Sequence, residues 1–115
     1  MAKVVRQYRY YSNANQSQNY PHSITREKLM SGNLFFGEDI LGPITQLGIQ
    51  TLPGVKFRLN DCLDDIIVGV TGIYELELEG IAEITRLRFN EESLRLIENS
   101  PNAYLIIDVL YEMEE

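Results

Sequence analysis

Residues 74–79 alternate without interruption between apolar side chains and glutamates. Successive side chains of a β-strand point to opposite faces of its sheet, so this run predicts a strand with one apolar face and one acidic face. Residues 55–59 repeat the pattern, with Phe57 inward and Lys56 and Arg58 outward. Strands of this kind need a sheet that is buried on one side and exposed on the other. The chain is therefore expected to fold around a sheet.

Two further runs, residues 66–70 and 103–111, are apolar on both faces, which is typical of central strands. Residues 44–50 form another candidate strand. The Pro-Gly pair at 53–54 predicts a type II turn, because proline presets one backbone angle and glycine accepts a positive φ. A hairpin between residues 44–50 and 55–59 follows from this turn.

Residues 85–89 alternate basic and apolar side chains. If this run pairs with residues 74–79, Arg86 and Arg88 lie across from the glutamates, and each pair contributes about 0.2 to 1 kcal/mol. Such pairing would fix the register of the two runs more than it would stabilise them; otherwise the acidic face of residues 74–79 meets water or a cationic partner.

The clearest helix signal lies in residues 91–99, where Asn90 is the N-cap, Leu94 and Ile97 share one face and Pro101 stands beyond the end. A weaker signal predicts a short helix over residues 24–30.

Ser23 is the expected N-cap of that short helix. After it, Phe35 and Phe36 lie between two glycines, and adjacent aromatics in a loop usually anchor it to the core or to a partner. We expect the core.

The chain has 115 residues, which allows one domain with one core. About six or seven short strands, with one helix (about residues 91–99) before the last of them, predict a mainly β fold: a small antiparallel β-sandwich or barrel-like domain. We expect residues 24–115 to form this single β-rich domain. Residues 1–23 are expected to form a basic, tyrosine-rich N-terminal arm and a polar linker.

The arm is the candidate partner-binding segment. Residues 4–11 are rich in β-formers and could add a strand to a sheet edge, whereas residues 12–23 contain almost nothing that can be buried. A strand on such a linker can pair with its own body or be exchanged with a neighbouring copy, and both alternatives stay open. The candidate contact residues are Arg6, Tyr8, Arg9, Tyr10 and Tyr11.

Charge is unevenly distributed along the chain. Residues 1–30 hold five basic residues and one acidic residue, a balance of +4, and the remaining 85 hold 5 and 16, a balance of −11, which together make the net charge of −7. Segments of opposite charge can dock within one chain or between copies, with a strength that salt screens.

Few residues offer chemistry. His22 and Cys62 are the only histidine and cysteine, and neither has the flanking residues of an active site. Asp61, Asp64 and Asp65 form the one candidate cation cluster, but their spacing does not match an EF-hand loop, and a solvated turn is the expected structure. We expect no enzyme activity, no bound metal and no cofactor.

Other partner classes are not favoured either. Only the arm combines basic and aromatic residues, and an acidic body repels phosphate, so nucleic-acid binding is unlikely. The sequence contains no signal peptide and no apolar run long enough to span a membrane, so we expect a protein made and kept in solution, without a membrane partner. A small-molecule ligand is not indicated.

Three segments carry a family resemblance: residues 47–60 (LGIQTLPGVKFRLN), 67–76 (IVGVTGIYEL) and 103–112 (AYLIIDVLYE). Their order is similar to that in short β-domains of head-decoration, head-fibre or tail-associated proteins of tailed bacteriophages and prophages of Firmicutes. These are turn and strand motifs, so the resemblance transfers no catalytic residue.

The resemblance implies a structural virion protein that is made in the cytoplasm of a bacterial host. Such a protein would act by protein–protein assembly, as a homo-oligomer and with other virion proteins, with the arm as the contact. The alternative is a small phage-encoded or bacterial binding protein that sequesters a host protein or a small ligand.

Overall fold

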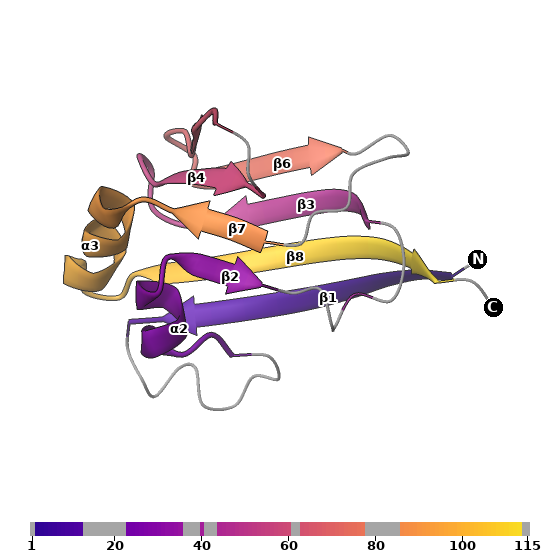
Figure 1. Cartoon of the computed structure of the whole chain (residues 1–115), viewed down its shortest axis with the longest axis horizontal. Helices are drawn as coiled ribbons and strands as arrows, with labels where there is room; N and C mark the ends of the chain where they lie inside the picture. The colour runs from indigo at the N-terminus through magenta and orange to yellow at the C-terminus, as the bar shows by residue number, and fades with distance from the viewer. Residues whose placement is uncertain are drawn as a thin grey trace.

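The computed structural model describes residues 2–12, 23–35, 40, 44–60, 63–77 and 86–113. These residues form eight strands and two helices (Figure 1), which confirms the mainly β fold. The elements in chain order are β1 (Ala2–Tyr11), α2 (Arg26–Met30), β2 (Asn33–Phe35), β3 (Ile44–Gln50), β4 (Lys56–Leu59), β5 (Ile66–Ile67), β6 (Ile73–Glu77), β7 (Arg86–Phe89), α3 (Glu91–Asn99) and β8 (Tyr104–Met113).

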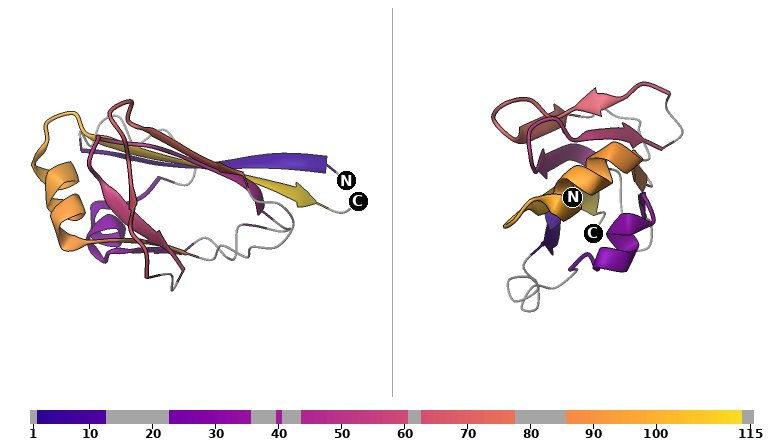
Figure 2. Two further views of the ribbon diagram at one scale, coloured as in Figure 1. Left: turned by 90° about the horizontal axis from the view of Figure 1, so that it is seen from above. Right: turned by 90° about the vertical axis from the view of Figure 1, so that its left-hand side faces the viewer.

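The strands make two four-stranded antiparallel sheets. Sheet A has the order β1-β8-β3-β6 and sheet B has the order β2-β7-β4-β5. The sheets pack face to face like a sandwich, with α3 across one end (Figure 2). Both ends of the chain lie at the opposite end of the molecule (Figure 1).

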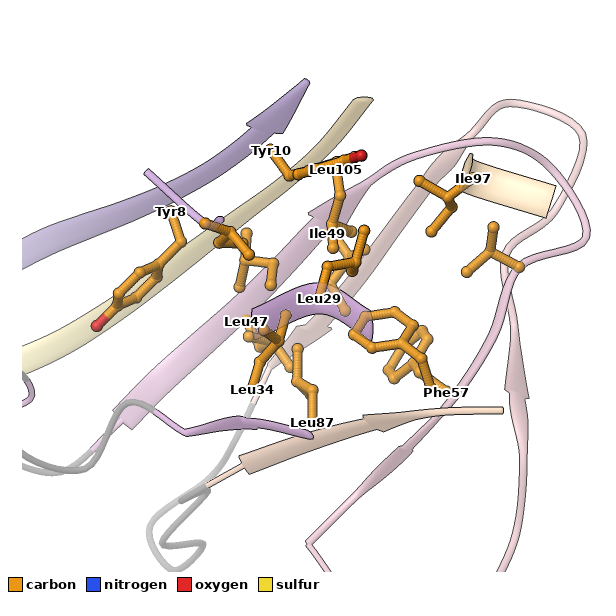
Figure 3. Close-up of a cluster of buried hydrophobic side chains, with 14 of the residues drawn as sticks. Tyr8, Tyr10, Leu29, Leu34, Leu47, Ile49, Phe57, Leu87, Ile97 and Leu105 are labelled. Atoms are coloured by element: carbon orange, nitrogen blue, oxygen red, sulfur yellow. The ribbon is translucent and has the colours of Figure 1, made fainter. Parts of the chain in front are cut away.

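The hydrophobic core fills the space between the inner faces of the two sheets (Figure 3). Phe57 of sheet B is central to it: its ring meets Tyr74 of sheet A edge-on, with ring centroids 5.5 Å apart, and lies 6.1 Å from Phe89. Leu29 of α2 and Ile97 of α3 are fully buried in the same core. Both helices are therefore held by tertiary packing.

Several local predictions are confirmed. Helix α3 covers residues 91–99, and Asn90 Oδ1 accepts a hydrogen bond from the Ser93 amide at 2.8 Å. The type II turn is present, since the Val55 amide donates to the Leu52 carbonyl at 3.3 Å and Gly54 has a φ of 89°. Strand β8 lies in the interior of sheet A, between β1 and β3.

The hairpin expected between residues 44–50 and 55–59 is wrong, because β3 and β4 belong to different sheets. After the turn, the Gly54 amide donates to the Val68 carbonyl at 2.8 Å, and the Val68 amide donates to the Val55 carbonyl at 2.9 Å. These bonds direct the chain towards β5 and away from β3.

The central strand expected over residues 66–70 is also wrong. Only Ile66 and Ile67 form a strand, β5, and it is an edge of sheet B. A turn then begins, in which the Gly72 amide donates to the Gly69 carbonyl at 3.0 Å and Val70 is 94% exposed. The glycines end the strand before it can gain a second neighbour.

The predicted pairing of residues 74–79 with residues 85–89 does not form. Strand β6 is an edge of sheet A beside β3, whereas β7 lies in sheet B between β2 and β4. Neighbours in sequence often pair, but a connection that crosses between two packed sheets separates them. Residues 78–85, which include the last glutamate of the run, lie outside the described residues.

Two smaller expectations are corrected near α2. Its N-cap is Thr25, whose hydroxyl accepts from the Lys28 amide at 3.1 Å, and Ser23 forms an isolated bridge to Arg9 instead. Phe35 does not anchor to the core: it ends β2 and is 59% exposed. Phe36 lies outside the described residues.

Candidate interaction surfaces

The predicted arm is strand β1, and all ten of its residues pair with β8 of the same chain, from Ala2 opposite Met113 to Tyr11 opposite Tyr104. Tyr8 and Tyr10 point to the inner face and are 8% and 6% exposed, as part of the core (Figure 3). Arg6 lies on the same face by the alternation of the strand and is half-buried. Whether residues 1–23 form a unit separate from residues 24–115 stays a prediction.

The other two candidates of the arm, Arg9 and Tyr11, lie on the outer face of sheet A. Arg9 Nε donates to Gln7 Oε1, and Arg9 Nη1 donates to the Tyr11 hydroxyl at 3.4 Å. Gln7 Nε2 in turn donates to Asp108 Oδ1 on β8 at 2.6 Å. The polar side chains of the arm are thus linked to its neighbouring strand.

The free side of β1 is a strand edge. The Arg9 carbonyl accepts from the Ile24 amide at 2.7 Å, away from β8. Backbone groups alternate in direction along a strand, so those of Lys3, Val5 and Gln7 point the same way. Within the described residues, only the bridge between Arg9 and Ser23 borders β1 on this side. Val5 is 61% exposed beside this edge.

The outer face of sheet A is mostly acidic. In register across the sheet, Asp108 lies level with Glu75, and Glu77 lies one row further along. Carboxylates therefore occupy β6 and β8, while the basic residues of this face stand on β1. The charged residues of the outer face of sheet A are Lys3, Arg9, Glu75, Glu77, Asp108 and Glu112.

The outer face of sheet B is basic. Arg58 and Arg88 lie opposite one another on β4 and β7, and Arg86 stands two residues along β7. The Arg86 guanidinium lies over the exposed Phe35 ring, 5.9 Å from its centroid. The basic residues of this face are Lys56, Arg58, Arg86 and Arg88. They are four of the five lysines and arginines that follow residue 30.

Sequence reasoning missed this division of charge. The alternation of residues 55–59 and 85–89 correctly put the basic side chains outward. The assumed pairing of β6 with β7 would have neutralised Arg86 and Arg88 against the glutamates. In the structure the two sets of charges lie on opposite outer faces of the sandwich.

The described residues contain no group of three or more histidine, cysteine, aspartate or glutamate side chains that could hold a metal ion. Asp64 and Asp65 are exposed, and Asp65 Oδ1 accepts from Arg58 Nε at 2.7 Å. The other members of the candidate sites, His22, Asp61 and Cys62, lie outside the described residues.

None of the helices in the described part of the chain has the length and apolar character needed to cross a membrane. Comparison of the chain with protein families, with characterised proteins and with solved structures finds no match.

Proposed function

We propose that this chain is a structural virion protein of a tailed phage or prophage, and that it acts by assembling with further copies of itself and with other virion proteins. The virion part of the proposal rests on the resemblance of residues 47–60, 67–76 and 103–112. The assembly part rests on the edge of β1.

That edge is the observation that carries the proposal. A long edge strand presents unpaired amide and carbonyl groups, and proteins that stay monomeric usually blunt such edges with charges, prolines or covering segments. In β1 the edge near Arg9 is covered by Ile24, whereas the backbone groups of Lys3, Val5 and Gln7 point outward. A strand of a partner can pair there through main-chain hydrogen bonds.

The experiment is substitution of Val5 by proline. The Val5 amide points away from β8, so proline leaves the ladder between β1 and β8 intact and removes a donor only from the free edge. Deletion of the strand is a poor test, because it would also remove Tyr8 and Tyr10 from the core. Val5→Thr is the matched control, since it keeps the amide and the shape of the side chain.

We expect size-exclusion chromatography with light scattering to give an oligomer for the wild type and for Val5→Thr, and a smaller species for Val5→Pro. A wild type that stays monomeric at every concentration would overturn the assembly function. The virion part is tested by mass spectrometry of purified particles from the strain that encodes the chain, and absence of its peptides would overturn it.

A further inference from the structure

The outer faces of the two sheets carry opposite charge. Among the residues that the structure describes, the face of sheet B holds four basic residues and the face of sheet A holds four acidic and two basic ones. This division is unexpected in a chain with a net charge of −7. It leaves most of the positive charge of residues 31–115 on one side of the sandwich.

The charges also have matching spacing. Glu75 and Glu77 are two residues apart on β6, and Arg86 and Arg88 are two residues apart on β7. Side chains that are two residues apart on a strand are separated by roughly 6.4–6.8 Å, so the acidic row and the basic row have the same period. An acidic row can therefore lie along a basic row with each carboxylate beside a guanidinium.

Each face also has exposed apolar side chains at its margins. Phe35 and Ile67 stand on the two edge strands of sheet B and are 59% and 56% exposed. Val5 and Ile73 stand on the two edge strands of sheet A and are also exposed. Contact between the faces would bury apolar surface around a charged centre.

We propose that copies of this chain associate face to face, with the basic outer face of sheet B of one copy against the acidic outer face of sheet A of the next. The inference rests on the proposed assembly function and names the partner and the surfaces. Because the two surfaces differ, the contact is heterologous and adds copies in a ring or a filament.

A second copy fits this basic face better than a nucleic acid does. Arg58 is already paired with Asp65 on one side of the face, and the chain carries a net charge of −7, which disfavours a polyphosphate. The partner has to present spaced carboxylates together with apolar groups, and sheet A of the chain itself presents both.

The test begins with Lys56→Glu/Arg88→Glu, which removes the net positive charge of the basic face, since the two glutamates offset Arg58 and Arg86. Arg88 lies opposite Arg58, so the new glutamate gains a cationic neighbour within the sheet and the fold is retained. The matched control is Lys28→Glu/Arg95→Glu, which changes the net charge equally on the two helices, away from both faces. At low salt we expect the average mass of the first variant to fall to that of the species held by the β1 edge alone, and the control to assemble like the wild type.

The acidic face is reversed in Glu75→Lys/Glu77→Lys, which is expected to give the same smaller species when it is alone. Mixing the two variants restores one contact, because the unchanged basic sheet B of Glu75→Lys/Glu77→Lys fits the unchanged acidic sheet A of Lys56→Glu/Arg88→Glu. A species that contains both variants, and that separates again when salt is added, is the expected result.

The outcomes separate this inference from the function on which it rests. If both reversed variants assemble as the wild type does while Val5→Pro does not, face-to-face association is wrong and the assembly function stands. If the wild type is monomeric, both fail. If Lys56→Glu/Arg88→Glu leaves the mass unchanged but abolishes retention of a labelled duplex DNA, the basic face binds nucleic acid and the inference is overturned.

Discussion

Two strands of this chain, β8 and β5, have the same kind of sequence but occupy different positions, one in the interior of its sheet and the other at an edge. Both are apolar on both faces. Strand β8 is ten residues long and lies between β1 and β3, whereas β5 is two residues long and lies at the edge of sheet B. An apolar run therefore indicates a strand, but its place in the sheet depends on how far it can extend.

The exposure of the two strands reflects their neighbours. In β8 the inward residues, from Leu105 to Tyr111, are buried, and the outward Ile106 and Leu110 are half-covered by side chains of the adjacent strands. In β5, Ile67 has a neighbour on one side only and is 56% exposed. Four predictions test this contrast.

Truncation in the central strand should have the largest effect. Ile107 is 1% exposed, and Ile107→Ala removes buried methyl groups and leaves a cavity, so we expect the free energy of unfolding to fall by about 2–5 kcal/mol. Urea unfolding followed by circular dichroism measures the change. A loss below about 1 kcal/mol would show that β8 is not packed on both sides.

The turn that ends the edge region should come next. Gly72 has a φ of 72°, and a Cβ built there would lie 2.7 Å from the Thr51 carbonyl oxygen. Gly72→Ala should cost about 1–2 kcal/mol for the left-handed backbone, and the clash adds to this cost. Gly69→Ala is the control, because no atom lies within 4 Å of its Cβ position, and it should unfold like the wild type.

Thr51 joins the two regions and should have an intermediate effect. Its hydroxyl donates to the Tyr104 carbonyl at the start of β8 at 2.8 Å, and its amide donates to the Gly72 carbonyl at 3.0 Å. Thr51→Val removes the first of these bonds, and we expect a loss of about 1 kcal/mol in the same urea experiment. Thr45→Val, whose half-buried hydroxyl lies 3.3 Å from the Leu110 carbonyl, should lose less.

Substitution on the edge strand should have the smallest effect. Ile67→Ser changes an exposed side chain with few neighbours, so its free energy of unfolding should lie within about 0.5 kcal/mol of that of the wild type. The prediction applies to chains separated by dilution and high salt, since the proposed face-to-face contact would cover Ile67. A loss as large as that of Ile107→Ala under these conditions would contradict it.

Much of the local structure could be predicted from the chain. The period of two in residues 74–79 identified β6, the asparagine cap identified α3, and the Pro-Gly pair identified the turn before β4. The burial of Phe57 and the outward direction of Lys56 and Arg58 followed from the same alternation. These features depend on residues close together in sequence.

The candidate surfaces were predicted less well. The tyrosine-rich and arginine-rich arm predicts Tyr8 and Tyr10 as contact residues, and nothing near them in sequence shows that β8 will place them over the core. The basic face likewise needs β4 and β7 to be neighbours, although 26 residues separate Asn60 from Arg86, which are hydrogen bonded at the end of that pair.

By itself, the sequence determined most of the longer strands and helix α3 and which side of most strands is apolar, because side-chain period and capping are local properties. Only the tertiary structure decided that β8 is central and β5 an edge, that β3 and β4 lie in different sheets, and that glutamates and arginines face away from each other. The physical reason is that a strand edge can pair with any strand of matching face and length. The choice among them is made by the packing of the whole core.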